Sequence, residues 1–228
     1  PTRAFVMSQD STRGYYDESY HFAEDVEKPN RPRTRVALRE IEPLAGTRML
    51  DLGCGAGLGT RMAIEEGGAS LAVGLDFSWT ALALARRTSP VGAWIQGDGT
   101  TLPFRDGAFD RVFSHGSMEH FPDVAAGFRE LQRVLAPGGR AVIVVPNFWV
   151  KTEQPLEFRA DQRGWTGVIE RAGLRVLRVG TDSGPAILKN LHPLRVLMRI
   201  ALRVVSLFPP IRYQHVFVLE KPARQAGP

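Results

Sequence analysis

From Thr47 onward, short apolar runs alternate with longer stretches in which apolar residues recur at helical spacing. Within 122–135, for example, Val124, Phe128 and Leu131 follow one another at intervals of four and three residues, as on one face of a helix. The runs have the length of strands. The predicted strands are one ending at Met49-Leu50, followed by 70–75, 93–96, 110–114, 140–145, 174–179 and 215–219.

The segments between these runs carry the signals of helix ends. A helix following the first strand is predicted to stop at Gly67-Gly68. Ser78 is a suitable N-cap for the next helix, which extends through Arg87, and a further helix is predicted at 163–172. Such alternation predicts an α/β fold: a doubly wound, mainly parallel seven-stranded sheet with helices on both faces. Ligands then bind at the carboxyl ends of the strands.

Composition adds few constraints. A chain of 228 residues suits one domain. The formal net charge of +5 favours anionic substrates, a membrane surface or nucleic acid, although solvated arginines explain it more simply. Cys54 is the single cysteine, which excludes an intramolecular disulfide and fits a reducing, cytoplasmic setting. No apolar run reaches the ~18 residues of a membrane span.

The segment Asp51–Gly57, which reads Asp-Leu-Gly-Cys-Gly-Ala-Gly, carries the strongest chemical signal. A strand leads here into a turn whose glycines let the backbone approach a ligand closely. Dinucleotide-binding loops follow G-x-G-x-x-G, but Leu58 and Thr60 stand where the last glycine would be. Asp51 would also repel a pyrophosphate, whereas it suits a cationic ligand.

This segment resembles the first motif of class I S-adenosylmethionine-dependent methyltransferases. Further matches follow in the order typical of that family, over about residues 44–146. The resemblance implies that Asp76 binds both ribose hydroxyls, that Asp98 accepts from the adenine amine and that the Gly99 N–H faces the ring. The matching segments are Val73–Asp76, Gly97–Phe104, Phe109–His115 and Leu131–Gly139.

The resemblance implies that the cofactor is S-adenosylmethionine, with S-adenosylhomocysteine as product. Arg33 and Arg35 are candidates to pair with its methionine carboxylate, and a solvated basic helix face is an equally good interpretation. Asp110 and the 137–139 turn are interpreted as structural. The predicted cofactor-binding residues are Asp51, Gly53, Cys54, Gly55, Gly57, Asp76, Phe77, Asp98, Gly99, Ser114 and Arg33.

His115, Glu119 and His120 raise the question of a metal site. Zinc-binding histidines on a helix are commonly four residues apart, whereas these two are five apart, so no metal is predicted. The resemblance accounts for His120, because the family often has His there. His115 follows a strand end near the expected acceptor, so it is either a general base or part of the cofactor wall.

The chain is expected to form one domain, 1–228. Residues 44–180 form the cofactor-binding core and 215–221 the last strand. Residues 1–43, with predicted helices at 14–27 and 34–43, form a helical lid over the cofactor by the same resemblance. Its dense aromatic residues are Tyr15, Tyr16, Tyr20 and Phe22.

Residues 181–214 form an insertion between the last two strands. Within it, Pro193–Leu207 is predicted to be a helix that is apolar nearly all round, with Arg195, Arg199 and Arg203 in one stripe. Three interpretations remain open: a cap or dimer contact, an interfacial membrane helix, or a pocket wall for a long apolar substrate.

The expected reaction is methyl transfer by in-line displacement to a small-molecule acceptor, such as a natural-product, glycan or lipid-like precursor. A membrane-associated lipid or quinone methyltransferase is the first alternative. A non-catalytic S-adenosylmethionine-binding protein is an alternative from another class. No nucleic-acid partner is expected, because no Asn-Pro-Pro-Tyr-like segment and no appended binding module is found. A homodimer and peripheral membrane contact through Pro193–Leu207 remain open.

Overall fold

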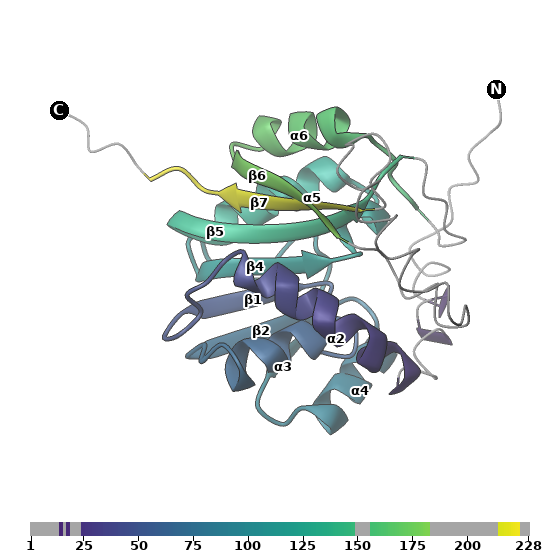
Figure 1. Ribbon diagram of the computed structural model, residues 1–228. Helices are drawn as coiled ribbons and strands as arrows, with labels where there is room; N and C mark the ends of the chain where they lie inside the picture. The colour runs from purple at the N-terminus through teal and green to yellow at the C-terminus, as the bar shows by residue number, and fades with distance from the viewer. Residues whose placement is uncertain (1–13, 16, 19–23, 149–155, 183–213, 224–228) are drawn as a thin grey trace, which may run out of the picture.

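The computed structural model describes residues 14–15, 17–18, 24–148, 156–182 and 214–223. Its centre is one seven-stranded sheet with the strand order β3-β2-β1-β4-β5-β7-β6, and Figure 1 looks onto one face of this sheet. The strands are β1 (Arg48–Leu52), β2 (Leu71–Asp76), β3 (Ala93–Gln96), β4 (Phe109–His115), β5 (Leu135–Pro146), β6 (Arg175–Asp182) and β7 (Gln214–Glu220).

The sheet is parallel except for β7. Strands β1 to β5 pair in parallel, whereas β7 lies between β5 and β6 and is antiparallel to both. The predicted mainly parallel, doubly wound α/β sheet is therefore confirmed. The chain reverses its direction of winding between β1 and β4, which is where such folds bind ligands.

Two hydrophobic cores cover the two faces of the sheet. One core joins β-strand residues to α2 (Glu24–Arg39) and α3 (Leu58–Glu65). The other contains residues of α5 (Val124–Val134) and α6 (Gln162–Arg171), with Phe128 and Trp165 fully buried. α4 (Trp79–Thr88) packs on β2 and β3. In Figure 1, α2 crosses the front of the sheet and α5 lies behind it.

Side-chain caps begin three of the helices. Ser78 Oγ accepts from Ala81 N at 3.1 Å, so the predicted N-cap of α4 is confirmed. Asp123 and Asp161 act in the same way at the starts of α5 and α6. Such caps satisfy backbone N–H groups that have no partner within the helix.

The N-terminal helix boundaries were wrong in the sequence analysis. Two helices, 14–27 and 34–43, were predicted, whereas α2 runs without interruption from Glu24 to Arg39. Burial of Ala37 and Leu38 in the core supports this continuous helix, because tertiary packing overrides local propensity. The helix ends before Pro43. Hydrogen bonds of the 3₁₀ type, donated by Glu40 N and Ile41 N, tighten its last turn.

The 137–139 segment is not a turn that precedes a strand, as the sequence suggested. β5 begins at Leu135 and passes through this segment as a bulge, since its register with β4 jumps from Phe109↔Leu135 to Arg111↔Arg140. Lys221 holds the bulge in place, because its carbonyl accepts from Gly138 N at 2.8 Å and its N–H donates to Gly139 O at 3.0 Å.

Several predictions concern residues outside those described, namely Tyr16, Tyr20, Phe22 and the Pro193–Leu207 helix with its arginines. Within the described ranges, no helix has both the length and the apolar character that crossing a membrane requires.

Candidate active site

The glycine-rich turn is fastened to the end of β2 by its own backbone. Gly53 N and Cys54 N both donate to Leu75 O, at 2.8 and 3.1 Å, and Gly57 N donates to Cys54 O at 2.9 Å. These N–H groups are therefore used within the protein. These hydrogen bonds hold the turn against the end of β2.

Asp76, at the end of β2, is buried and lies directly against this turn. Its Oδ2 accepts from Gly55 N at 2.8 Å, and its Oδ1 accepts from Ser78 N at 2.9 Å. Burial raises the pKa of the Asp76 carboxyl, and the hydrogen bonds from Ser78 and Gly55 oppose that effect. A carboxylate offers about four acceptor positions, and hydrogen bonds from the backbone of Ser78, Gly55 and Phe77 already use part of this capacity. The remaining capacity can accept hydroxyl donors, so Asp76 fits the vicinal diol of a ribose.

Asp51, at the end of β1, fixes the start of α3. Its buried Oδ2 accepts from Thr60 N at 2.7 Å and from Thr60 Oγ1 at 2.9 Å. Burial raises the pKa of the Asp51 carboxyl to about 7. Gly59, which the sequence analysis did not single out, makes this contact possible, since a Cβ there would lie 2.7 Å from Asp51 Oδ2.

Three of the expected site glycines leave room for protein side chains. A Cβ on Gly53 would lie 2.3 Å from Ser117 Oγ, and this hydroxyl also donates to Gly53 O at 3.0 Å. A Cβ on Gly57 would lie 2.3 Å from the Trp94 ring, and one on Gly99 would lie 2.2 Å from Phe121. Gly53 and Gly57 also have positive φ angles of 73° and 84°, which favour glycine.

Asp98 lies in the turn after β3, close to Asp76. Gly97 N donates to Asp76 O at 3.0 Å, which holds the two strand ends together. Asp98 Oδ1 accepts from Thr100 N and Thr100 Oγ1, each at 2.8 Å. The structure thus brings the three predicted acids to the carboxyl ends of the neighbouring strands β1, β2 and β3.

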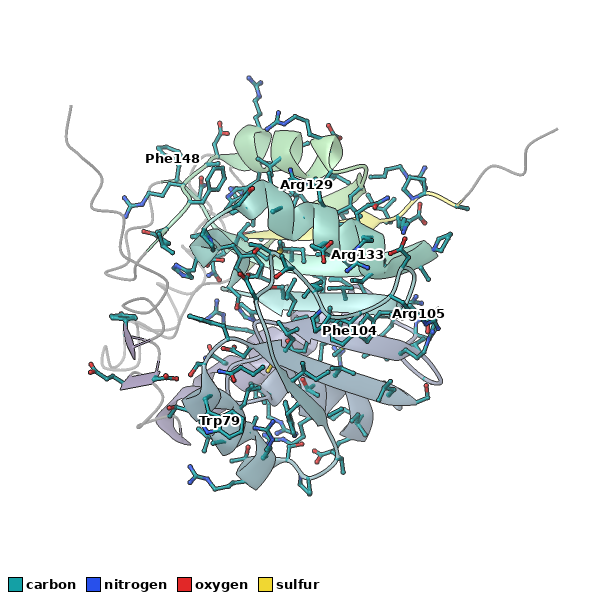
Figure 2. All side chains as sticks on the ribbon, turned by 180° about the vertical axis from the view of Figure 1, so that it is seen from behind. Trp79, Phe104, Arg105, Arg129, Arg133 and Phe148 are labelled. Atoms are coloured by element: carbon teal, nitrogen blue, oxygen red, sulfur yellow. The ribbon has the colours of Figure 1, made fainter. Side chains whose placement is uncertain are left out.

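Helix α5 fastens the segment that follows Asp98. Leu102 N donates to Glu130 Oε2 at 2.7 Å, while the Arg133 guanidinium donates to Leu102 O at 3.0 Å and to Phe104 O at 2.6 Å. Figure 2 shows Arg133 and Phe104 on this side of the molecule. Arg133 also lowers the pKa of the Glu130 carboxyl through their hydrogen bonds. The segment expected to line an adenine is therefore fixed from behind.

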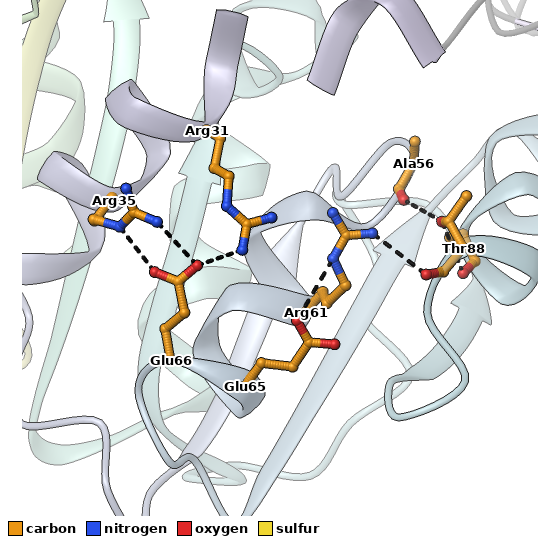
Figure 3. A network of polar contacts seen from close by, with 8 residues as sticks. Arg31, Arg35, Ala56, Arg61, Glu65, Glu66 and Thr88 are labelled. Carbon is orange, nitrogen blue, oxygen red and sulfur yellow. Dashed lines mark hydrogen bonds and ion pairs between the residues drawn. The ribbon is translucent and has the colours of Figure 1, made fainter. Parts of the chain in front are cut away.

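The arginines proposed for the methionine carboxylate have protein partners. Arg35 Nε donates to Glu66 Oε2 at 2.8 Å, and Arg31 Nη2 to Glu66 Oε1 at 2.6 Å, at the exposed surface (Figure 3). Arg33 contacts Asn30 Oδ1 at 3.2 Å and Gln214 Oε1. Gln214 begins β7 and pairs with Pro146 at the carboxyl end of β5, so the Arg33 guanidinium contacts the chain at the carboxyl edge of the sheet. Its predicted role remains a prediction.

The end of β4 carries buried polar groups of a different kind. Ser114 is fully buried, and its Oγ has no hydrogen-bond partner within the described part of the chain. The same holds for Oε2 of Glu119, a residue with 3% exposure in the short helix η2 (Met118–His120). Burial raises the pKa of the Glu119 carboxyl to about 8. His115 lies between them in sequence. Its ring meets the Phe113 ring edge-on, and the two ring centroids are 6.2 Å apart.

Glu119 also connects this region to the chain beyond β5. Its carbonyl accepts from Phe158 N at 2.6 Å, and its Oε1 lies 3.8 Å from His120 Nε2. The nearby Glu157 carboxylate contributes to the raised pKa of the Glu119 carboxyl. Among the residues that the structure describes, no three His, Cys, Asp or Glu side chains gather as a metal ion would require.

Comparison with known proteins supports this arrangement of motifs. Residues 50–143 match the profile of the family described as "Methyltransferase domain". A solved S-adenosylmethionine-dependent methyltransferase from Mesorhizobium loti shares the fold, with a TM-score of 0.66, 21% identity, and coverage of 82% of this chain and 96% of that one. Over residues 50–143 the chain is therefore similar to a methyltransferase domain. A phosphoethanolamine N-methyltransferase from Haemonchus contortus has the same fold, with a TM-score of 0.69 and 19% identity over 96% of this chain and 61% of its own.

The chain is also similar in sequence to two methyltransferases whose names refer to a demethylmenaquinone and a naphtoquinone. It is 38% identical over 110 residues to a demethylmenaquinone methyltransferase of Corynebacterium kroppenstedtii, covering 48% of this chain and 46% of the relative. It is 37% identical over 114 residues to a 2-phytyl-1,4-naphtoquinone methyltransferase of Thermosynechococcus vestitus, covering 48% of this chain and 51% of that relative. The chain thus spans about half the length of these relatives.

Some features of the site were missed from sequence. Ser117, Trp94 and Phe121 occupy the spaces that three site glycines leave. The clustering of Gly57, Gly74 and Gly92 around the single Trp94 ring is a signal that the spacing of the motifs did not contain.

Proposed function

We propose that the protein is an S-adenosylmethionine-dependent methyltransferase that acts on a small molecule, most specifically an isoprenoid-substituted naphthoquinone-type acceptor. The observation that carries the cofactor assignment is the set of three acids, Asp51, Asp76 and Asp98, at adjacent strand ends around the glycine turn. The acceptor class rests on the printed names of the relatives. The long apolar segment Pro193–Leu207 suits a substrate with an apolar tail.

When bound, S-adenosylmethionine supplies an activated methyl group on a good sulfonium leaving group. Asp76 accepts hydrogen bonds from the ribose hydroxyls, and Asp98 accepts one from the adenine amine. The buried, hydrogen-bonded surroundings of Asp76 keep its oxygens in place, so binding needs little reorganisation. His115, at the end of β4, takes the proton from the acceptor at an imidazole nitrogen. The remaining contribution of the protein is positioning and exclusion of water.

Calorimetry with S-adenosylhomocysteine tests the cofactor assignment. We expect micromolar binding, about 8 kcal/mol, and a loss of roughly 1.5–3 kcal/mol in Asp76→Ala, the scale of a hydrogen bond to a charged group. Asp110→Asn is the matched control, since Asp110 pairs with Arg48 at the opposite end of the sheet. Tight NAD binding, or unchanged affinity in Asp76→Ala, would contradict the proposal.

A turnover assay tests the acceptor class separately. Formation of S-adenosylhomocysteine should depend on an added demethylated naphthoquinol bearing an isoprenoid tail. Substitution of a benzenoid acceptor without a tail should reduce it. Cofactor binding without turnover on either acceptor would reject the acceptor class and leave the cofactor assignment standing.

A further inference from the structure

A continuous series of hydrogen bonds leads from the N-terminal segment to the acid at the end of β2. Asp17 Oδ1 accepts from Ser78 Oγ and, at 3.3 Å, from Thr80 N. Ser78 N in turn donates to Asp76 Oδ1 at 2.9 Å, and Gly55 N donates to Asp76 Oδ2 at 2.8 Å. Asp17 is thus linked through one residue to the carboxylate proposed to bind ribose, although 61 residues separate it from Ser78.

The chemistry of this helix end explains why an acid occupies the position. The first N–H groups of a helix lack partners within it and carry partial positive charge. Ser78 is fully buried, and its hydroxyl accepts from Ala81 N while donating to Asp17, so both functions of the hydroxyl are used. Asp17 adds a negative charge to the same end of α4 and satisfies Thr80 N.

The same arrangement places two carboxylates near one another. The charge of Asp17 contributes to the raised pKa of the Asp76 carboxyl. Donors that approach Asp76 offset this repulsion, because a hydrogen bond to the ionised form of a carboxyl favours it. A ribose that donates two hydroxyls to Asp76 is such a ligand.

We propose that Asp17 is a positioning residue for the cofactor: it binds the start of α4 through Ser78 and Thr80 and holds Ser78 and Asp76 in the orientation that receives the ribose. This inference rests on the proposed function. Because linkage is reciprocal, cofactor binding also strengthens the docking of the segment that contains Asp17.

Calorimetry with S-adenosylhomocysteine on the full chain tests the inference. Asp17→Ala should weaken binding by about 5- to 20-fold, the range of a lost hydrogen bond. Asp17→Asn should stay within about threefold of the unsubstituted protein, because its amide oxygen still accepts from Ser78 and Thr80. Glu18→Ala is the matched control, since Glu18 is the exposed neighbour of Asp17, and it should bind normally.

Two further measurements separate positioning from simple stabilisation. In a Ser78→Ala background, Asp17→Ala should cost less than about twofold in affinity, because coupled residues are not additive. S-adenosylhomocysteine should slow proteolysis of the N-terminal segment in the unsubstituted protein but not in Asp17→Ala.

The outcomes distinguish the inference from the function on which it rests. An unsubstituted protein that fails to bind S-adenosylhomocysteine would remove the proposed function. If it binds, and Asp17→Ala binds equally well, the function stands and the inference is overturned. An Asp17→Ala protein that is unfolded without ligand would assign Asp17 to folding, which also overturns the inference.

Discussion

The carboxyl edge of the sheet has two halves, which differ in whether their buried polar groups have hydrogen-bond partners. At the ends of β1 to β3, each of the acids Asp51, Asp76 and Asp98 accepts hydrogen bonds from neighbouring backbone and hydroxyl groups. At the end of β4, Ser114 Oγ and Glu119 Oε2 are buried without a partner in the described part of the chain. The polar groups of the first half are satisfied within the protein, whereas the second half contains buried polar atoms without a partner among the described residues.

This difference indicates how the work of binding is divided. A preorganised half suits a ligand that is the same in every reaction, such as a cofactor, because nothing has to move when it binds. Buried polar groups without partners cost free energy, and native proteins keep few of them. Their presence at the end of β4 supports a role for this half in contacting the methyl acceptor.

The largest expected effect concerns His115, in the second half. If His115 is the general base, His115→Ala should lower the rate by ~10²–10⁴ and leave the affinity for S-adenosylhomocysteine unchanged. Rates and affinities measured at several pH values check this. A loss below tenfold throughout would make His115 part of the cofactor wall and weaken the division into two halves.

The next effect concerns how the free energy of unfolding depends on pH. The pKa of the Glu119 carboxyl is about 8 in the folded protein, above its ordinary value of about 4.3 in an unfolded chain. The folded state then binds the proton more tightly, so the free energy of unfolding should fall as pH rises between these values, by up to about 1.4 kcal/mol per pH unit. Denaturant unfolding from pH 5 to 9 measures this slope.

Glu119→Gln supplies the comparison, because it removes the titrating group while keeping its shape. The fall in stability with pH should become shallower in this variant. Asp51, whose pKa of about 7 is raised in the same direction, should account for part of the remaining slope. Identical slopes in the two proteins would show that Glu119 is ionised in the fold.

A smaller effect is expected at the seam between the halves. A Cβ on Gly59 would lie 2.7 Å from both Asp51 on β1 and the Phe113 ring on β4. Gly59→Ala should therefore destabilise the protein by about 1–3 kcal/mol through overpacking, although alanine favours helix. Gly180→Ala is the control, since its nearest neighbour would be 3.7 Å away. Thermal unfolding compares the two, and equal midpoints would contradict the prediction.

The smallest effect is expected at the amino edge. Asp110 forms an ion pair with Arg48 at 2.8 Å, and both side chains are about one-third exposed, at 33% and 36%. Asp110→Asn should cost less than about 1 kcal/mol, as exposed pairs do, and the cost should shrink in high salt. Affinity for S-adenosylhomocysteine should not change. A change would mean that the two edges of the sheet are coupled.

The sheet could be predicted from sequence because its signals are local. The predicted strand at 93–96 is exactly β3, Ala93–Gln96, and Ser78 is the cap that its residue type suggested. The motif acids could be placed for the same reason, since each follows directly after an apolar strand. Parallel strands then bring their carboxyl ends to one edge.

The contacts that complete the site could not be predicted in this way. Ser117 lies 64 residues from Gly53, and Asp17 lies 61 residues from Ser78, so no spacing in the sequence relates them. The local pattern predicted a break within 28–33, where core packing keeps α2 continuous. The protein partners of Arg33 and Arg35 likewise depend on how α2 lies against α3 and β7.

The position of β7 has a consequence for the order in which the protein can be completed during synthesis. β7 is the last described strand along the chain, yet it fills the sheet between β5 and β6. Until residues 214–220 have left the ribosome, the almost wholly apolar stretch 141–145 of β5 has an unpaired edge. Such an edge invites pairing with other chains. The nascent protein is therefore most exposed to aggregation in the interval before residues 214–220 emerge, and a chaperone that shields β5 during that interval would raise its yield.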